Sequence, residues 1–178
     1  MEWNEQSIIK GCKKQSKKAQ KILLYKYKDE FLGVCLRYVD NKGVAEEILM
    51  DSFIAIFKKI HLYKENSFKG WMKTIVIHKA IDYYRKHKND PYLSNIESEE
   101  WRLSGRMQQN NLETTELLRM LSTLPPGYRL VFNLYAIEGY SHKEIAEQLG
   151  VTVNTSKTQL WKGKIRLKEI LEKGGYYG

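Results

Sequence analysis

Residues 141–166 read SHKEIAEQLGVTVNTSKTQLWKGKIR, a stretch with the pattern of two short helices joined by a tight turn. Ser141 is a favourable N-cap, and Glu144 three residues later can complete a capping box. Gly150 follows where the first helix must end, a place that favours a residue with positive φ. The stretch predicts a helix-turn-helix, whose second helix enters the major groove of DNA. An ordinary helical hairpin is the alternative.

The second of these helices has one buried side and one polar side. At 3.6 residues per turn, a buried stripe centred on Leu160 includes Ser156 and Gly163. The side chains expected to point largely away, or to flank that outer face, are polar or basic: Thr155, Lys157, Thr158, Gln159, Lys162 and Arg166. Hydroxyl and amide groups can read base edges, and Lys and Arg can neutralise phosphates or contact guanine. This combination favours duplex DNA over solvent as the neighbour of the face.

The bulk composition agrees with a polyanionic partner. The chain has 178 residues with 30 Lys and Arg against 21 Asp and Glu, a net charge of +9. Cys12 and Cys35 form neither a CxxC pair nor part of a metal-ligand cluster, and Cys35 falls in an apolar helical stripe typical of a core. No apolar run is long enough to span a membrane, and no secretory signal is evident. We therefore expect a soluble intracellular protein.

The chain divides into two helical lobes and a linker. Residues 1–88 are helical in pattern with few breakers, and residues 113–174 carry the helix-turn-helix. Residues 89–112 between them are polar, rich in Ser and without sustained periodicity, which predicts a flexible linker. Strand-like alternation is absent over any useful length. The expected fold class is all-α, with two small helical domains.

A helix expected over residues 45–60 has an unusual outer face. Its core stripe includes Leu49, Phe53 and Ile56, and half a turn away lies a mixed apolar and charged set: Glu47, Met50, Asp51, Ile54 and Lys58. Apolar anchors beside carboxylates suit a contact with a basic protein surface. In the alternative interpretation, Met50 and Ile54 pack under the N-terminal helix.

The next helix interleaves aromatic and basic residues. Phe68 and Trp71 open it, and its later turns carry further candidates for nucleic-acid contact: His78, Lys79, Asp82, Arg85 and Lys86. Single-stranded nucleic acid stacks its bases on aromatic rings while its backbone follows positive charge. A Trp such as Trp71 also often belongs to a core. His78 and Asp82 lie one turn apart, but no third ligand is near, so we expect neither a metal nor another cofactor.

Together these segments resemble the extracytoplasmic-function (ECF) group of bacterial RNA polymerase sigma factors, the smallest members of the sigma-70 family. Residues 45–60, AEEILMDSFIAIFKKI, resemble the helix that grips core RNA polymerase. Residues 68–86, FKGWMKTIVIHKAIDYYRK, resemble the region that melts and reads the −10 promoter element. Residues 124–167, LPPGYRLVFNLYAIEGYSHKEIAEQLGVTVNTSKTQLWKGKIRL, resemble the domain that binds the −35 element.

The resemblance implies a set of roles and partners. The face around Glu47 and Asp51 would dock on core polymerase, whose β′ coiled coil and β flap are the expected contacts. Three residues before and at the start of the next helix, Asn66, Ser67 and Phe68, would help to form a pocket for a flipped −10 base. An anti-sigma protein is a further expected partner, and neither a catalytic site nor a small-molecule substrate is expected. The chain departs from the family at Ser156, where a Val usually packs the recognition helix.

Three other functions compete with this interpretation. A stand-alone helix-turn-helix regulator would bind duplex DNA without polymerase, but its first lobe shows no evident ligand pocket or dimer face. A nuclease or recombinase would need converging carboxylates, for which the candidates are Glu46, Glu47, Asp51 and Asp82. A purely structural helical protein leaves the two nucleic-acid faces unexplained.

Overall fold

The computed structural model describes residues 3–64, 67–90 and 112–174, so Asn66 and most of the expected linker lie outside the described residues. Every regular element in these ranges is helical, and no strand occurs among them, which confirms the all-α prediction. The chain forms two compact units. Unit 1 contains Met1–Cys35 and Gly43–Ala80, and unit 2 contains Leu36–Lys42 and Ile81–Gly178. In the described part of the chain, no helix is both long and apolar enough to span a membrane.

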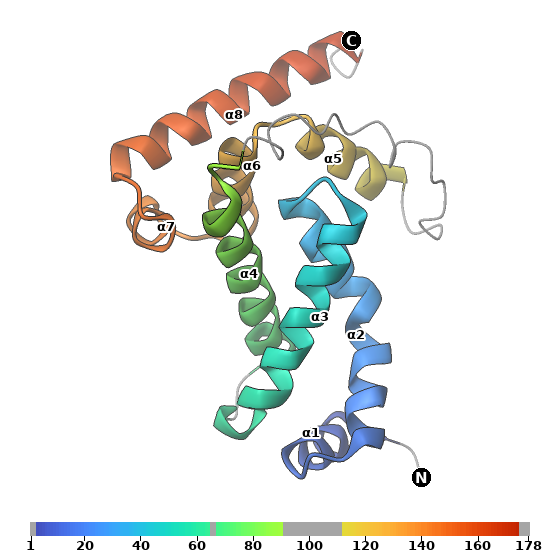
Figure 1. The fold of residues 1–178 in the computed structure, drawn as a ribbon. Coiled ribbons are helices and arrows are strands. Elements are labelled where there is room, and N and C mark those ends of the chain that lie inside the picture. Colours follow the sequence, from blue (N-terminus) through green and yellow to red (C-terminus); the bar gives the residue numbers. More distant parts are fainter. Residues whose placement is uncertain (1–2, 65–66, 91–111, 175–178) are drawn as a thin grey trace. The chain divides into compact units, whose positions relative to one another are not determined.

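Figure 1 shows the elements along the chain. In chain order they are α1 (Glu5–Lys13), α2 (Lys17–Tyr38), α3 (Lys42–Lys59), η1 (Ile60–Leu62), α4 (Phe68–His87), α5 (Leu112–Ser122), α6 (Pro126–Phe132), the π-helical η2 (Asn133–Ile137), α7 (His142–Leu149) and α8 (Val153–Lys173). The α2 and α4 helices each run from one unit into the other.

Unit 1 is built on contacts between α2 and α3. The rings of Phe31 and Phe53 pack with their centroids 6.2 Å apart, and both side chains are fully buried. The buried stripe predicted for α3 is confirmed, because Leu49, Phe53 and Ile56 all lie in the core. Ser52 belongs to the same stripe, and its hydroxyl donates to the carbonyl oxygen of Ile48 at 2.6 Å. A polar group can therefore occupy this core because its hydrogen bond is made within the helix.

Both cysteines are buried and neither forms a disulfide. Burial raises the pKa of Cys12 to about 11, so this thiol stays protonated at neutral pH. The prediction that Cys35 is a core residue is confirmed. Both thiols act as small apolar side chains in the packing of unit 1.

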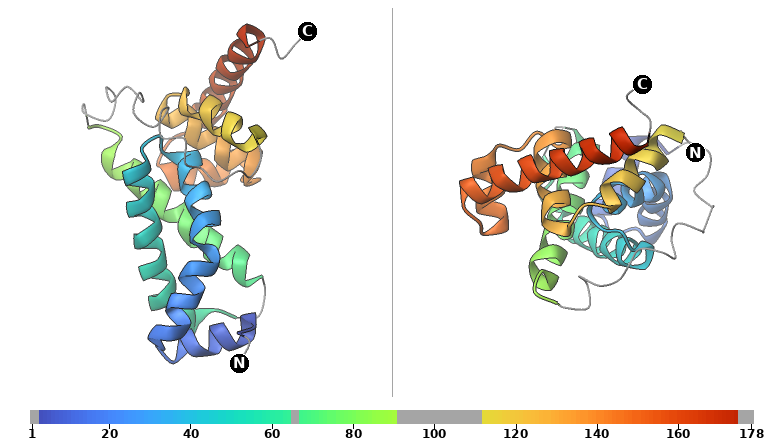
Figure 2. Two further views of the ribbon diagram at one scale, coloured as in Figure 1. Left: turned by 90° about the vertical axis from the view of Figure 1, so that its right-hand side faces the viewer. Right: turned by 90° about the horizontal axis from the view of Figure 1, so that it is seen from above.

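Unit 2 is organised around α8. The α5, α6 and α7 helices all pack against it, and Figure 2 shows this arrangement from two further sides. Leu121, Leu124 and Leu167 form a buried apolar cluster. Helices α6 and α8 approach closely at Gly163, where a Cβ atom would lie 3.6 Å from the Cβ of Tyr128. A Cβ atom there is in ordinary van der Waals contact, so alanine would fit, whereas the further atoms of a bulky side chain would meet Tyr128.

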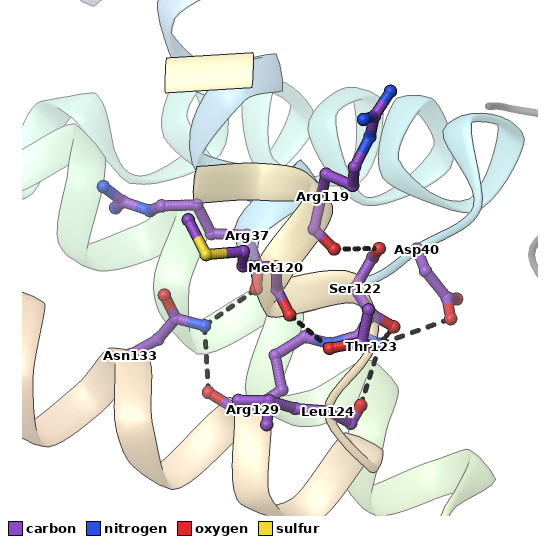
Figure 3. A network of polar contacts seen from close by, with 9 residues as sticks. All are labelled: Arg37, Asp40, Arg119, Met120, Ser122, Thr123, Leu124, Arg129 and Asn133. Carbon is purple, nitrogen blue, oxygen red and sulfur yellow. Dashed lines mark hydrogen bonds and ion pairs between the residues drawn. The ribbon is translucent and has the colours of Figure 1, made fainter. Parts of the chain in front are cut away.

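A buried arginine connects the end of α5 to α6. Arg129 is 2% exposed, and one terminal nitrogen donates to the carbonyl oxygens of Ser122 at 2.8 Å and Leu124 at 3.0 Å (Figure 3). The same nitrogen lies 3.3 Å from the carboxylate of Asp40. Burial lowers the pKa of Arg129, and the charge of Asp40 opposes that shift. Carbonyl groups at the end of α5 are thus satisfied by a side chain instead of water.

A second buried polar residue continues this network. Asn133 is fully buried at the start of η2, and its side-chain nitrogen donates to the carbonyl oxygens of Arg37 at 2.7 Å and Arg129 at 2.9 Å (Figure 3). Arg37 also pairs with Glu138 at 2.5 Å. These bonds hold the last turn of α2 against the α6–η2 segment within unit 2.

Candidate nucleic-acid interface

The outer face of α3 is exposed as a mixed apolar and acidic surface. Met50 is 50% exposed and Ile54 is 49% exposed, so the alternative in which they pack under the N-terminal helix is wrong. Three charged residues of the same predicted face are also exposed: Glu47, Asp51 and Lys58. Large apolar side chains that stay half exposed on a helix with a complete core on its other side are suited to a protein partner.

An aromatic cluster stands at the start of α4. The rings of Phe68 and Trp71 stack with centroids 5.9 Å apart, and Tyr63 lies 5.0 Å from Phe68 and 5.4 Å from Trp71. Phe68 is buried, whereas Trp71 is partly exposed. Ser67 is exposed, and its hydroxyl accepts from the amide of Gly70 at 3.1 Å. The Phe68 ring therefore packs beneath the Trp71 ring and does not reach the surface. We had expected Phe68 to help form a pocket for a flipped base.

The remaining candidates on α4 share one side of the helix. Counting 100° per residue from Trp71, most of them fall within about 60° of it, and Lys79 lies near 80°. The exposed members are His78, Asp82, Arg85 and Lys86, and Lys79 is half-buried. One helix thus presents a ring and, about two turns further on, a set of polar and mostly basic groups that extends over about two turns. Such a surface is able to stack a base and hold a phosphate backbone.

The helix-turn-helix forms as the sequence predicts. Ser141 accepts from the amide of Glu144, and the carboxylate of Glu144 accepts from the Ser141 amide at 2.8 Å, which completes the capping box. Hydrogen bonds from Ser141 lower the pKa of Glu144. Gly150 ends α7 with φ +65°, the left-handed conformation that favours glycine. Thr152 caps α8 by accepting from the amide of Thr155 at 3.0 Å.

Ser156 makes a contact between the two helices that the sequence alone did not reveal. Its side chain is fully buried, and its hydroxyl lies 2.9 Å from Nδ1 of His142. The imidazole of His142 also stacks on Tyr135 with ring centroids 4.4 Å apart. Burial lowers the pKa of His142, and Lys157 and Lys164 lower it further. A hydrogen bond therefore replaces the apolar packing that a Val would provide at this position.

The polar side of α8 is only partly exposed to solvent. Four of the predicted contact residues are exposed: Lys157, Thr158, Lys162 and Arg166. Thr155 is half-buried, and its hydroxyl lies 2.9 Å from the hydroxyl of Thr152. Gln159 is also half-buried and leans toward α6, because a Cβ atom on Gly127 would lie 3.2 Å from its Nε2. Helix periodicity predicted that Thr155 and Gln159 point outward, but neighbouring turns cover part of each.

Two exposed apolar residues on α8 were missed by the sequence analysis. Trp161 is 62% exposed, and Ile165 one turn later is 37% exposed. Counted at 100° per residue, Ile165 lies about 20° and Trp161 about 60° from Thr158, both on the side away from Lys162. A Trp inside a stretch of Lys and Thr residues, on no apolar stripe, was the available signal. The ring of Trp161 adds a large flat surface to the exposed part of α8.

No metal centre accompanies these faces within residues 3–64, 67–90 and 112–174, where no three His, Cys, Asp or Glu side chains gather around a common point. The four carboxylates considered for a nuclease include Glu46, Glu47 and Asp51 on α3, and all four are exposed on helix surfaces. A two-metal centre requires ligands that converge on ions about 4 Å apart. The described residues offer no such arrangement.

Comparison with known proteins identifies the two parts of the chain. Residues 23–89 match the family model described as Sigma-70 region 2, and residues 114–167 match the model described as Sigma-70, region 4. The chain is 29% identical over 184 residues to the ECF RNA polymerase sigma factor SigW of Bacillus subtilis, covering 96% of this chain and 98% of that protein. It is 27% identical over 156 residues to SigM of the same organism, covering 83% and 92% respectively.

A solved structure shows the same fold. The sigma factor RpoE in complex with the anti-sigma factor NepR, from Bartonella quintana, matches with a TM-score of 0.50 at 17% identity, covering 85% of this chain and 96% of that chain. At this identity the likeness is one of fold.

The chain belongs to the sigma-70 family of RNA polymerase sigma factors. Within that family, its relatives assign it to the ECF group. Its function is therefore that of a sigma factor, which binds core RNA polymerase and directs promoter recognition, promoter melting and initiation of transcription. The stand-alone regulator is not favoured. Sigma-70 proteins are non-enzymatic initiation factors.

Proposed function

We propose that each of the exposed faces described above has a separate role in initiation. The outer face of α3 docks on core polymerase, the Trp71 side of α4 binds the melted −10 element, and the outer side of α8 binds the −35 element as duplex. We assign the first two roles to a domain of residues 1–88 and the third to residues 113–174, with residues 89–112 as the linker. The half-exposure of Met50 and Ile54 on the same side of α3 as the exposed acids Glu47 and Asp51 carries this proposal.

The α3 face suits a basic helical partner such as the β′ coiled coil. Met50 and Ile54 supply apolar area that the fold leaves in water, and Glu47 and Asp51 supply negative charge beside it. Buried apolar anchors contribute most of the affinity at such a contact, while flanking charges set orientation and association rate. Lys58, at the C-terminal end of the face, limits the negative potential to the first turns.

The α4 face suits displaced single-stranded DNA. Trp71 is half-buried on the stacked Phe68 ring, which holds it in a fixed orientation for a base. Ser67 lies exposed directly before the helix and can donate to a flipped base. Extrusion of a base costs a few kcal/mol, which stacking and hydrogen bonding must offset. Arg85 and Lys86 then neutralise phosphates about four turns further along the helix.

The α8 face suits the −35 duplex. Thr158 and Lys162 are exposed at the centre of the outer side, and Lys157 and Arg166 flank them. We assign base contacts to Thr158 and Lys162 and phosphate contacts to Lys157 and Arg166, in keeping with the geometry of helices in the major groove. We further propose that the chain has no catalytic activity of its own, acts in the cytoplasm with its polymerase, and is restrained by an anti-sigma protein.

The first test is co-elution with bacterial core RNA polymerase on size-exclusion chromatography. The wild-type chain should co-elute, and the Glu47→Lys/Asp51→Lys variant should not, because both acids lie on the docking face. A matched control, Asp29→Lys/Glu147→Lys, reverses the same charge at exposed residues of α2 and α7 and should co-elute. Co-elution of the Glu47→Lys/Asp51→Lys variant would overturn the docking assignment. Tight duplex binding without co-elution of the wild type would overturn the proposed function itself.

A further inference from the structure

His142 lies where the two helices of the helix-turn-helix come together. It is the first residue of α7, and its half-buried imidazole stacks on the ring of Tyr135 with centroids 4.4 Å apart. Its Nδ1 atom lies 2.9 Å from the hydroxyl oxygen of Ser156, the fourth residue of α8. In helix-turn-helix proteins the first helix crosses the DNA backbone, and the N-terminal part of the second contacts base edges. The contact therefore joins the backbone-crossing helix to the turn that contacts bases.

The bond to Ser156 holds the first turn of α8 in place. Ser156 is fully buried, and its amide donates to the carbonyl oxygen of Thr152 at 3.0 Å. Its neighbours in sequence, Thr155 and Lys157, both belong to the predicted DNA-contact set. A buried hydroxyl without a partner is unfavourable, so loss of the imidazole would favour a shift of this turn toward water. His142 thus sets the position of DNA-contacting side chains through Ser156.

The charges around the imidazole are mostly positive. The charged or titratable groups that face it or adjoin it are Lys157 and Lys164 on α8, Tyr135 on η2, and Lys143 and Glu144 on α7. The carboxylate of Glu144 accepts from the amide and the hydroxyl of Ser141, which directs it to the helix cap. Burial lowers the pKa of His142, and the two lysines of α8 lower it further. In the free protein the imidazole is therefore neutral at physiological pH.

A DNA phosphate would reverse this balance of charge. Lys157 is close enough to the imidazole to lower its pKa, so a phosphate bound to Lys157 lies near the imidazole as well. Its negative charge offsets the lysine and favours the imidazolium. The bond to Ser156 is possible in both states, because Nδ1 can accept from the hydroxyl in the neutral ring and donates to its oxygen in the imidazolium. Protonation is therefore compatible with one position of α8.

We propose that His142 is the positioning residue of α8 and that binding of the −35 duplex takes up a proton at its imidazole. This proposal rests on the proposed function, because it needs the phosphate contact of Lys157. It adds a residue that orients the DNA-contacting side chains without touching a base. The DNA-bound imidazole holds its proton more tightly than the free one, so by reciprocity the proton strengthens DNA binding. Affinity for the −35 duplex is therefore lowest at high pH and rises as the pH falls through the ionisation of the bound imidazole.

The first test measures holoenzyme affinity for duplex DNA with the −35 element at fixed salt, from about pH 8 to about pH 6. His142→Asn can still bond to Ser156 through its amide but does not titrate. Titrations of the polymerase cancel in the ratio of the wild-type affinity to that of this variant. The ratio should rise by about threefold or more as the pH falls. The matched control His61→Asn changes an exposed histidine of η1, and its ratio should stay constant.

The second test separates position from charge. His142→Phe can stack on Tyr135 but leaves the Ser156 hydroxyl without its partner, so it should weaken −35 binding several-fold at about pH 8. His142→Asn should bind better than His142→Phe at that pH. His142→Phe/Ser156→Val replaces the polar contact by an apolar one and should regain most of the affinity. Native-state hydrogen exchange of the α7 amides shows whether each variant is folded, and the double variant keeps the test decisive if His142→Phe is not.

The outcomes separate this proposal from the proposed function. A constant ratio of wild type to His142→Asn would overturn the proton uptake, and a ratio that falls with the pH would overturn its sign. Full affinity of a folded His142→Phe, or no recovery in the double variant, would overturn the positioning role. Lys157→Gln should abolish the rise of the ratio, and a rise that persists would overturn the coupling through phosphate. Failure of the wild type to co-elute with polymerase would instead overturn the proposed function itself.

Discussion

The Nδ1 atom of His142 lies 2.9 Å from the hydroxyl oxygen of the fully buried Ser156, so a polar contact joins the two helices of the helix-turn-helix. An unpaired buried hydroxyl would cost about 1–3 kcal/mol, and this hydrogen bond prevents that cost. The orientation of α8 relative to α7 therefore depends on an imidazole, and an imidazole can change charge near neutral pH.

The first prediction concerns the pH dependence of this contact. Because burial, Lys157 and Lys164 all disfavour the imidazolium, His142 should titrate below its ordinary pKa of 6.5. The folded chain then binds fewer protons than the unfolded chain. The contribution of His142 to stability is accordingly present above pH 6.5 and falls as the pH drops through the folded pKa. NMR titration of the imidazole carbons measures this directly, and Lys157→Gln should raise the pKa. A wild-type value above 6.5 would contradict the account.

The second prediction concerns the buried guanidinium of Arg129. Arg129→Met leaves the carbonyl groups of Ser122 and Leu124 without their donor and the carboxylate of Asp40 without its partner. We expect unit 2 to lose about 3 kcal/mol, the usual scale for removal of one member of a buried charged network. Native-state hydrogen exchange of α6 and α8 amides measures the loss. Arg119→Met, at an exposed position of α5, should change the exchange by less than about 0.5 kcal/mol.

The third prediction concerns the turn of the helix-turn-helix. Gly150 has φ +65°, and a Cβ atom there would meet nothing within 4 Å, so Gly150→Ala tests conformation without a clash. The left-handed backbone should cost Ala about 1–2 kcal/mol. Gly33 lies within α2 and also has open space around a Cβ, so Gly33→Ala should stabilise its unit by up to about 1 kcal/mol. Hydrogen exchange measures the free energy of unfolding of each unit, which should fall for Gly150→Ala and rise for Gly33→Ala.

The fourth prediction concerns the outer side of α8. Lys157→Ala/Arg166→Ala should weaken −35 duplex binding and make its log–log salt slope shallower by about 2, because the two residues assigned to phosphates lose their charges. Lys10→Ala/Lys59→Ala removes the same charge elsewhere and should leave the slope unchanged. Filter binding of the holoenzyme to a promoter that requires the −35 element gives both slopes. Equal slopes for the two variants would show that another side of α8 meets DNA.

Local chemistry made much of the recognition domain predictable. The capping box at Ser141, the positive φ of Gly150 and the buried stripe through Leu160 and Gly163 depend on residues within a few positions of one another. Periodicity also gave the core stripe of α3. It could not give the orientation of Gln159, because the α6 residue Gly127 that adjoins its side chain lies far away in the sequence.

The sequence by itself determined the helix-turn-helix, the helical class and the order of the basic, aromatic and acidic segments. These follow from hydrogen bonds and side-chain spacing within single helices. Only the tertiary structure decided that Met50 and Ile54 stay exposed, that Phe68 is buried below Trp71, and that His142 satisfies Ser156. Burial and pairing of these side chains depend on which distant helices pack against them. The pattern of residues within one helix contains no information about which other helices pack against it.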